Sequence, residues 1–428
     1  MPPFERRPRT IPGLLVAVGR IYLRRTNGRR FAQVFVFLLL LLVAAVVWRA
    51  AWPTSCTASS GTHANDSPRL SVAVTPSIAG TASGYGLTWV DLRDRHTEVY
   101  FARLAPDGAR IGEPRRLTND DGVKLFPQLV WSGAQFGLSW TAVSGQDAAV
   151  WFVRLDPTGT PIGAAMRVSL GGARAFGARV AWNGRAFGVA WFEVRSAREF
   201  GVRVARIDAE GRRIGDAIDV RTGAIVTGMP DVVADRTGFA VSFNEVLPRA
   251  GQTATTVVRI PAEGAADEPV ILSLRAGLAL QSTLAVHRGG TLAAAWRDGV
   301  GVDGSTLAAA TLRTDGTKTG RVEITDGRGH AGSPSIFAGR DAFGLAWTQS
   351  GTAGGVRFVR IGLDGQRVGE PLALTTHNRP AQTPSVAWGR TEYAVAWCDA
   401  RAGGLAIYVA RVSASGTRVG EDVRVSAD

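Results

Sequence analysis

The sequence predicts an all-β fold built from copies of one unit, and the main observation is a repeated five-residue stretch. Its clearest copy is Phe187-Gly188-Val189-Ala190-Trp191. Successive side chains of a strand point to opposite faces, so Phe187, Val189 and Trp191 form a bulky face, and Gly188 and Ala190 leave the other nearly bare. The aromatic recurs about every 51 residues. The six counterparts are Tyr85 to Trp89, Phe136 to Trp140, Phe239 to Phe243, Leu292 to Trp296, Phe343 to Trp347 and Tyr393 to Trp397.

The contrast between the two faces explains why the unit is repeated. A sheet of this kind can nest its large side chains against the small-residue face of an identical neighbour, so each unit needs a copy of itself on either side. Each copy also has room for four short strands and contains no helical segment. The sequence therefore predicts a seven-bladed β-propeller of four-stranded antiparallel blades over residues 70–428.

The order of elements is the same in each unit. A first strand, as in Pro384 to Trp388, leads through a glycine-containing turn into the bulky and bare second strand. A variable loop follows, and then a third strand that ends in arginine in most copies. Glycines four residues apart, as at Gly416 and Gly420, supply the positive φ of a hairpin into the fourth strand. The ring could close by packing of the first blade on the seventh, or residues 70–75 could add a strand to a terminal blade.

Two copies show a more specific pattern of W-x-D-x-R, then I-Y-x-x-R or a close variant, then a glycine hairpin. Its residues are Trp397, Asp399, Arg401, Ile407, Tyr408, Arg411 and Gly416 in the last copy, and Trp89, Asp91, Arg93, Val99, Tyr100, Arg103 and Gly108 in the first. The pattern resembles a repeat of bacterial seven-bladed propellers in secreted and surface proteins, and more distantly the propeller of the Tol periplasmic translocation protein. The resemblance implies the fold; it implies no particular chemistry, because many functions share this scaffold.

The N-terminal region predicts a membrane anchor. Residues 1–30, with eight arginines and one acidic residue, are expected to be a basic cytoplasmic tail. Residues 31–52 are almost entirely apolar and would span roughly 33 Å as a helix, which is enough to cross a bilayer. Residues 53–69 are expected to be a flexible linker. We therefore expect a single-pass protein of the bacterial inner membrane, with the propeller periplasmic or extracellular.

Two alternatives to a retained anchor stay open. The apolar segment could be a cleaved secretory signal, although a basic leader of this length is long for one. Cys56 could be lipidated, because Thr54-Ser55-Cys56 partly resembles the end of a bacterial lipobox, although Pro53 stands where an aliphatic residue is expected. With Cys398 as the second of two cysteines, a disulfide framework is not indicated.

The net charge of +13 does not predict nucleic-acid binding. About half of the excess lies in residues 1–30, and the remaining basic residues are nearly balanced by acidic ones. Lys124 and Lys318 are the only lysines, so the basic residues are almost all arginine.

Candidate binding residues lie on the rim that carries the second-to-third and fourth-to-first loops, because variable loops on a rigid frame often bind ligands. Carboxylates stand two residues beyond the second-strand aromatic in five copies: Asp91, Glu193, Glu245, Asp298 and Asp399. They could line an acidic mouth that binds a cation, a basic peptide or sugar hydroxyls. They could instead accept hydrogen bonds from their own loops or pair with arginines such as Arg93, Arg195 and Arg401. We favour the second interpretation, because a residue repeated in most copies generally serves the repeat.

Residues that break the repeat are the better functional candidates. On the variable rim these are His96, Glu98, Asp120, His330 and His377. A histidine pair near carboxylates could bind a metal or move protons, and solvated loop histidines are the simpler interpretation. No metal site, cofactor or catalytic residue is assigned, because the chain has no nucleophile elbow, phosphate loop or CxxC pair.

These observations favour a membrane-anchored extracytoplasmic propeller that acts as a protein-binding or scaffold module in the bacterial envelope. Its partners would be proteins or another envelope component. The alternative is a propeller hydrolase or lyase that acts on a glycan or lactone at the variable rim. An enzyme would require carboxylate and histidine side chains that meet at the mouth of the channel. A purely structural envelope protein is a third possibility.

Overall fold

The structure is a computed structural model that describes residues 72–93, 97–196, 199–247, 252–276, 278–300, 304–313, 316–327, 329–350, 354–377 and 379–426. The predicted tail, transmembrane helix and linker, residues 1–69, lie outside these ranges. Among the residues that the structure does describe, no helical segment has the length and hydrophobicity needed to cross a membrane.

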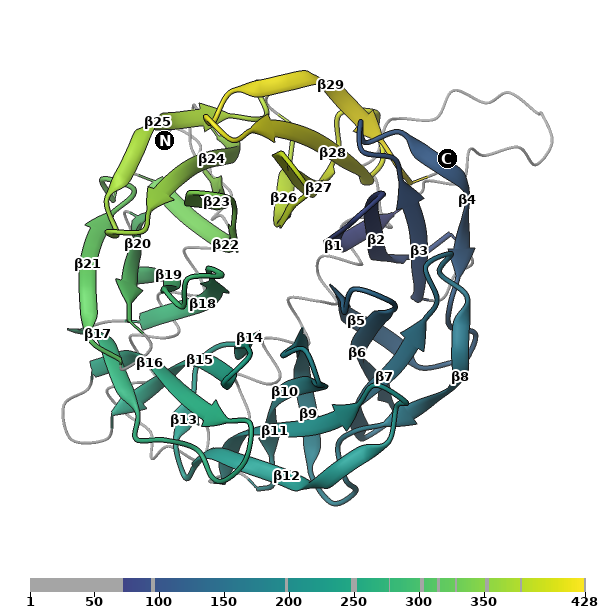
Figure 1. Ribbon diagram of the computed structural model, residues 1–428, viewed down its shortest axis with the longest axis vertical. Coiled ribbons are helices and arrows are strands. Elements are labelled where there is room, and N and C mark those ends of the chain that lie inside the picture. Colours follow the sequence, from purple (N-terminus) through teal and green to yellow (C-terminus); the bar gives the residue numbers. More distant parts are fainter. Residues whose placement is uncertain are drawn as a thin grey trace, which may run out of the picture.

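All regular secondary structure in the described ranges is β-strand, and the sheets form a ring with their first strands innermost and their last strands outermost (Figure 1). Four sheets each contain four antiparallel strands in chain order. Their strands are β1 (Ala73–Thr81), β2 (Gly84–Asp91), β3 (Glu98–Leu104) and β4 (Arg110–Arg116); β5 (Val123–Trp131), β6 (Phe136–Ser144), β7 (Asp147–Leu155) and β8 (Pro161–Arg167); β9 (Arg174–Trp182), β10 (Ala186–Val194), β11 (Phe200–Asp208) and β12 (Arg213–Thr222); and β26 (Ala381–Trp388), β27 (Glu392–Asp399), β28 (Ala406–Ser413) and β29 (Arg418–Arg424).

A fifth sheet has a divided first strand, because β13 and β14 both pair with β15. Its strands are β13 (Ile225–Val226), β14 (Asp231–Asp235), β15 (Gly238–Leu247), β16 (Gln252–Pro261) and β17 (Val270–Ala276). The sixth sheet has eight strands, namely β18 (Leu278–Val286), β19 (Leu292–Val300), β20 (Gly304–Leu312), β21 (Lys318–Glu323), β22 (Gly329–Ala338), β23 (Ala342–Gln349), β24 (Gly355–Gly362) and β25 (Arg367–Ala373).

The eight-stranded sheet means that the prediction of seven separate blades is not confirmed by the hydrogen-bonding pattern. The prediction of an all-β propeller with four-stranded antiparallel blades is confirmed, but five sheets stand as separate blades and β18 to β25 form one hydrogen-bonded sheet. The join is a short parallel pairing of Gly304 with Gly329 and of Ser305 with His330. Glycine makes this approach possible, because a Cβ on Gly304 would lie 2.1 Å from the Gly327 carbonyl oxygen.

The predicted nesting of bulky on bare faces is confirmed. The Phe239 ring of β15 lies against Gly188 of β10, where an added Cβ would be 2.4 Å from ring atom Cε1. The same contact joins the Phe187 ring to Gly137 and the Phe136 ring to Gly86, with an added Cβ at 2.6 Å in both cases. The buried hydrophobic side chains of the described residues accordingly form seven clusters, each drawn mainly from two consecutive repeat units.

The ring closes by packing of β1 on the sheet of β26 to β29. One of the seven clusters spans this seam, and the Ala73 amide donates to the Leu405 carbonyl oxygen at 2.8 Å. The Ile78 amide also donates to the Ser385 hydroxyl oxygen at 3.2 Å. The same inner-strand contact joins Leu129 to Ser77 and Val386 to Ser335 elsewhere in the ring. The seam is therefore closed by the ordinary contacts of the repeat and by a parallel bridge between Val72 and Leu405.

Three of the arginines that end third strands bind the following unit. Arg154, Arg206 and Arg360 donate to carbonyl oxygens in the third-to-fourth hairpin of the following unit: Ala209 at 3.0 Å, Pro261 at 2.7 Å and Ser415 at 3.3 Å. A long guanidinium side chain is suited to this role because it carries five donors in a fixed geometry. These three arginines therefore contribute to packing between consecutive units.

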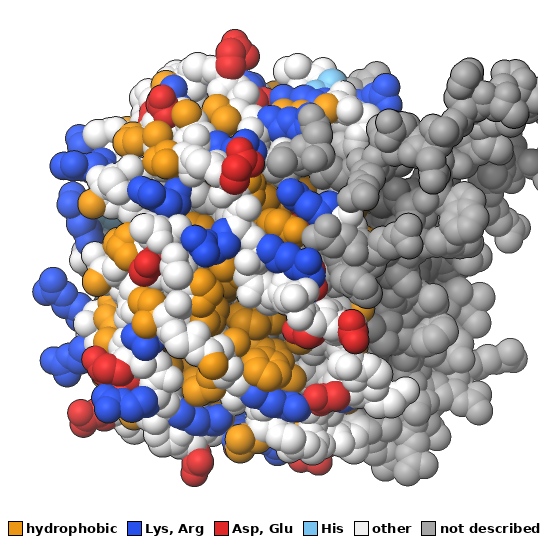
Figure 2. Space-filling view, turned by 90° about the vertical axis from the view of Figure 1, so that its right-hand side faces the viewer, with side chains coloured by type: hydrophobic (Ala, Val, Ile, Leu, Met, Phe, Trp, Pro, Cys, Tyr) orange, Lys and Arg blue, Asp and Glu red, His pale blue; other side chains and the backbone are white. Residues whose placement is uncertain are grey.

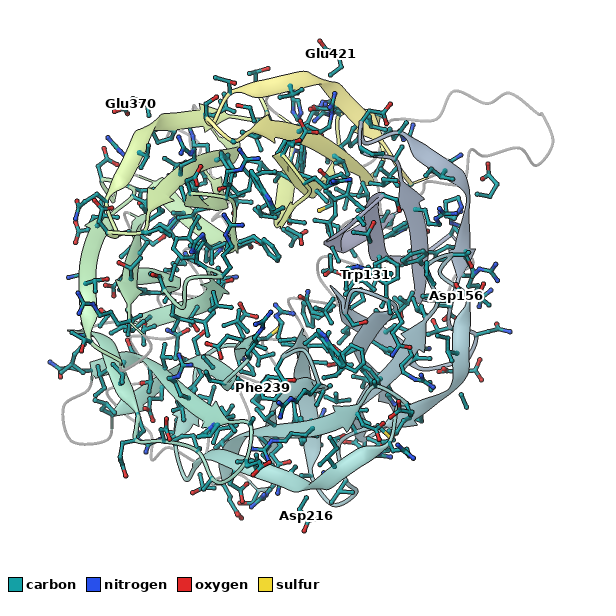
Figure 3. All side chains as sticks on the ribbon, in the orientation of Figure 1. Trp131, Asp156, Asp216, Phe239, Glu370 and Glu421 are labelled. Carbon is teal, nitrogen blue, oxygen red and sulfur yellow. The ribbon has the colours of Figure 1, made fainter. Side chains whose placement is uncertain are left out.

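The outer surface of the ring carries charges of both signs. Asp216, Glu370 and Glu421 project outward from the outermost strands β12, β25 and β29 (Figure 3). Seen from the side of β4 and β8, basic, acidic and hydrophobic side chains are interspersed (Figure 2). Charged side chains on an outermost strand protect its unpaired edge from pairing with other sheets.

Candidate functional site

The candidate carboxylates stand where the second strand of a unit ends. Asp91, Glu193 and Asp399 are buried at the ends of β2, β10 and β27. Glu245 and Asp298 occupy the same position in β15 and β19 and are buried as well. They belong to different units, so the repeat spaces them around the ring.

Asp399 shows the contacts of the motif most completely. Its Oδ2 accepts from the Trp397 indole at 2.8 Å and from Arg401 Nη2 at 2.6 Å, and its Oδ1 accepts from the Arg401 backbone amide at 2.9 Å. Arg401 also binds Asp422 of the outermost strand at 2.6 Å and lies over the Tyr408 ring, 4.2 Å from its centroid. Arg401 therefore connects the Asp399 carboxylate of the second strand with the third and fourth strands of the blade.

Asp91 and Glu193 repeat this arrangement. The Trp89 indole donates to Asp91 at 3.0 Å, and Arg93 Nη2 binds the same carboxylate at 2.6 Å. Arg195 binds Glu193 at 2.6 Å, in the same way. The interpretation that these carboxylates accept hydrogen bonds and ion pairs within their own blades is confirmed for the units that have arginine four residues after tryptophan.

Two units depart from this arrangement. Glu245 binds Arg221 of the preceding unit at 2.8 Å, so its carboxylate bridges two units. In β19 the residue four positions after Trp296 is Val300, and Asp298 instead accepts from the Ser273 hydroxyl at 3.0 Å. The buried Trp296 Nε1 has no hydrogen-bond partner among the described residues. The residue at position 298 therefore does not accept from the indole here, unlike its counterparts Asp91, Glu193 and Asp399.

Glu98 and Asp120 are brought together by Lys124, which sequence reasoning did not identify as a site residue. The Lys124 ammonium is fully buried and donates to Asp120 Oδ1 at 2.7 Å and to the Gly122 carbonyl oxygen at 2.5 Å. Glu98 Oε2 lies 3.8 Å from Nζ, and Glu98 also binds Arg116 at 2.7 Å. An internal cation thus occupies the oxygen-lined space that these two acids create.

The histidines have separate surroundings. His377 Nδ1 accepts from the Arg379 amide at 3.2 Å, so Nε2 carries the proton of the neutral ring and donates to Asp399 Oδ2 at 3.1 Å. His330 pairs with Ser305 at the join of the eight-stranded sheet, and its amide donates to the Ser350 hydroxyl at 2.8 Å. No hydrogen bond or ion pair links the two histidines in the described ranges, and His96 lies outside them.

No group of three or more His, Cys, Asp or Glu side chains is placed to hold a metal ion within the described residues. The chemistry of the described rim is that of paired carboxylates and guanidinium groups. Such groups hold strands together and can recognise polar partners at their exposed edges.

The loss of stability at acidic pH is expected to depend on Asp399. Burial acts to raise the pKa of Asp399, but hydrogen bonds from Arg401 and the Trp397 indole outweigh it and hold the pKa below its ordinary value of 3.8. A lowered folded-state pKa stabilises the protein above the unfolded-state value, and this stabilisation is lost as the pH falls through the folded-state value.

We therefore expect Asp399→Asn to lower the free energy of unfolding by about 2 kcal/mol at pH 7, and by less below pH 4. Urea titrations of the wild type and of Asp399→Asn, at pH 7 and below pH 4, measure this difference. The exposed Asp121→Asn change is the control and should have little effect at either pH. If the difference in unfolding free energy between the wild type and Asp399→Asn were equally large below pH 4, the stabilising role of the ionised Asp399 would be contradicted.

Cys398 is expected to be inert in the folded protein. Burial raises the pKa of its thiol to about 11, while the thiol lies near the Thr383 hydroxyl and the Gln382 carbonyl oxygen at 3.4 Å. Since the thiolate is the reactive form, iodoacetamide at pH 8 should leave Cys398 unmodified in the native protein and alkylate it in urea. Peptide mapping by mass spectrometry checks this, and equal labelling in both states would show that the prediction is wrong.

The comparisons define the class of the protein as a β-propeller. The chain resembles the propeller domain of the Trilobed protease from Pyrococcus furiosus, described as having an open velcro topology, at 9% identity over 84% of this chain and 98% of that one, with a TM-score of 0.50. It also resembles the acylaminoacyl peptidase of Pyrococcus horikoshii, at 11% identity over 83% of this chain and 52% of that one, with a TM-score of 0.50. This chain spans about half the length of the peptidases it resembles.

At these identities the likeness is one of fold alone. No protein-family model and no curated protein matches the sequence. The resemblance to the Tol propeller is therefore not confirmed, and the fold and the rim geometry are the basis for assigning a function.

Proposed function

We propose that this chain is a seven-bladed propeller that acts as a protein-binding or scaffold module, held at the outer face of a membrane by residues 31–52. The sevenfold count is supported by the division of the eight-stranded sheet into two antiparallel units, β18 to β21 and β22 to β25. The seven hydrophobic clusters between consecutive units support it as well. The parallel pairing at Gly304 and Gly329 would then be a local join between two blades.

The observation that best supports a binding role is that three rim carboxylates form hydrogen bonds and ion pairs within their own blades. Asp91, Glu193 and Asp399 each accept from a tryptophan indole and from an arginine. Charges held in such pairs build a rigid rim. The loops on this frame then vary in sequence, which suits recognition of a macromolecular partner.

The hydrolase or lyase alternative has one supporting contact, the hydrogen bond of 3.1 Å between His377 and Asp399. A general base of this kind would need an available carboxylate or imidazole nitrogen. Asp399 is already bound by Trp397 and Arg401, and His377 Nδ1 already accepts from a backbone amide. The geometry therefore favours a structural role for this pair.

The membrane attachment rests on the sequence of residues 1–52. Its test is extraction of the full chain from its native membranes: alkaline carbonate should leave the chain in the membrane pellet, and deletion of residues 31–52 should release it. Release of the intact chain by carbonate would contradict a spanning segment.

The binding role is tested by crosslinking and affinity capture from intact membranes. A rim variant would carry His330→Ala, His377→Ala and Asp121→Ala, of which Asp121 is exposed in the same fourth-to-first loop as Asp120. These changes spare the buried carboxylates. A matched variant would carry Arg185→Ala, Glu210→Ala and Arg212→Ala in the exposed turns of the opposite rim. We expect a specific partner with the wild type and the matched variant, and a loss of at least tenfold with the rim variant. Equal capture by all three would contradict the variable rim as the binding face, and no specific partner would contradict the function.

A further inference from the structure

The innermost strands carry a ring of equivalent polar residues, one in each repeat unit. These are Ser77, Gln128, Arg179, Asp231, Thr283, Ser335 and Ser385. Where the residue is serine, its hydroxyl accepts the backbone amide of the next unit, as from Leu129 to Ser77 at 3.0 Å. Arginine cannot accept a hydrogen bond, so Arg179 replaces a structural contact with a positive charge at the innermost strand.

Asp231, the acidic residue nearest to the Arg179 guanidinium, already accepts hydrogen bonds from other groups. Asp231 Oδ2 accepts from the Thr283 hydroxyl and from the Leu284 amide, both at 2.8 Å, and Oδ1 accepts from the Val232 amide at 3.0 Å. Arg179 Nε lies 3.7 Å from Oδ1, which is longer than a direct hydrogen bond between charged groups. Asp231 thus lowers the local charge without occupying the guanidinium donors.

The Arg179 guanidinium therefore makes fewer hydrogen bonds than its five N–H groups allow. Among the described residues, its hydrogen bonding is limited to a contact of 3.5 Å from Nη1 to the Ala178 carbonyl oxygen. Its side chain is 23% exposed although it lies on an innermost strand, so part of the side chain is accessible to solvent. Burial acts to lower the pKa of Arg179 and Asp231 acts to raise it, which reflects this partly desolvated position.

We propose that Arg179 binds a carboxylate of a peptide partner in the central channel, an inference that rests on the protein-binding function. A planar guanidinium matches a carboxylate in a two-point contact. The pair of Arg179 and Asp231 is close to neutral, so a single negative charge is accommodated better than the double charge of phosphate. The neighbouring Met229 side chain, which packs against Gly177, offers apolar contact to the chain that carries the carboxylate.

The test compares pairs of probes that differ only in one carboxylate. Acetyl-diglycine and its amide represent a peptide C-terminus, and the N-acetyl amides of aspartate and asparagine represent a side chain. Each is added to the full-length protein in detergent at constant ionic strength, and the unfolding equilibrium is measured. A dissociation constant of about 1 mM would shift that equilibrium about 100-fold at 100 mM ligand.

The variant Arg179→Ser restores the residue that other units use at this position, and Arg185→Ser removes an exposed arginine from a turn. We expect one carboxylate to stabilise the wild type and Arg185→Ser saturably, its amide to have no effect, and Arg179→Ser not to respond. The probe pair that responds distinguishes a C-terminus from an acidic side chain. Equal effects of acid and amide, an unchanged response in Arg179→Ser, or stabilisation by inorganic phosphate alone would overturn the proposal.

The capture experiment separates this inference from the proposed function. If Arg179→Ser captures the partner as well as the wild type does, and no carboxylate acts, the inference is wrong and the binding function stands. If no partner is captured but the carboxylate response depends on Arg179, the channel site stands and the protein-binding function is wrong.

Discussion

Replacing Lys124 with methionine is expected to lower the free energy of unfolding by about 1–3 kcal/mol, because it removes the hydrogen bonds that a buried ammonium donates to Asp120 and to the Gly122 carbonyl oxygen. Lys124 Nζ is fully buried between Asp120, at 2.7 Å, and Glu98, at 3.8 Å. Methionine retains the length of the side chain, so the loss would be mainly electrostatic. Urea unfolding followed by tryptophan fluorescence measures the change.

Lys318 supplies the matched control, because it is the other lysine of the chain and is exposed on β21. Lys318→Met should change the free energy of unfolding by no more than about 0.5 kcal/mol. Glu98→Gln should cost less in the Lys124→Met background than in the wild type, since the ammonium that lies 3.8 Å from the Glu98 carboxylate is then absent. Similar effects of the two lysine substitutions would mean that the contacts of Lys124 with Asp120, Gly122 and Glu98 contribute little to the free energy of unfolding.

Replacing Phe239 with alanine is expected to cost about 3–5 kcal/mol, because it empties a contact between two repeat units. The ring is 1% exposed and lies against Gly188 of the preceding sheet. Gly188 has no Cβ with which to fill the space, and the backbone of two hydrogen-bonded strands limits collapse around it. The same unfolding measurement applies.

Phe337→Ala is the control for this substitution. Phe337 is 42% exposed on β22, so removing its ring should cost less than about 1 kcal/mol. If the two alanine substitutions had equal effects, the contact between neighbouring units would not be a main source of stability.

The repeat and its packing logic could be predicted because they are local in sequence. Alternation within Phe187 to Trp191 specifies the two faces, and the spacing of the copies implies identical neighbours. The join of β20 to β22 could not be predicted in this way. It depends on the parallel approach of Gly304 and Gly329, which are separated by a whole fourth strand and its turns. Glycines are frequent throughout this chain, so their identity alone gave no signal.

Part of the candidate site could likewise be predicted from the sequence, and part could not. The contacts of Asp399 with Trp397 and Arg401 follow from residues two positions apart on a strand and its loop, and the sequence indicated them. Lys124 and Arg179 were not indicated, because their roles depend on residues that other strands and loops supply. Two signals were present: lysine is rare in this chain, and Arg179 replaces a serine of the repeat.

A double-mutant cycle between Gly188→Ala and Phe239→Leu tests most directly whether neighbouring units complete one another. Gly188 does not have a positive φ, so alanine brings no backbone strain, and its Cβ would lie 2.4 Å from the Phe239 ring. Overpacking of this kind costs about 1–3 kcal/mol. We predict that the cost of Gly188→Ala falls by at least about 1 kcal/mol when Phe239 is leucine. Additive costs, within about 0.5 kcal/mol, would contradict the nesting of each blade against the next.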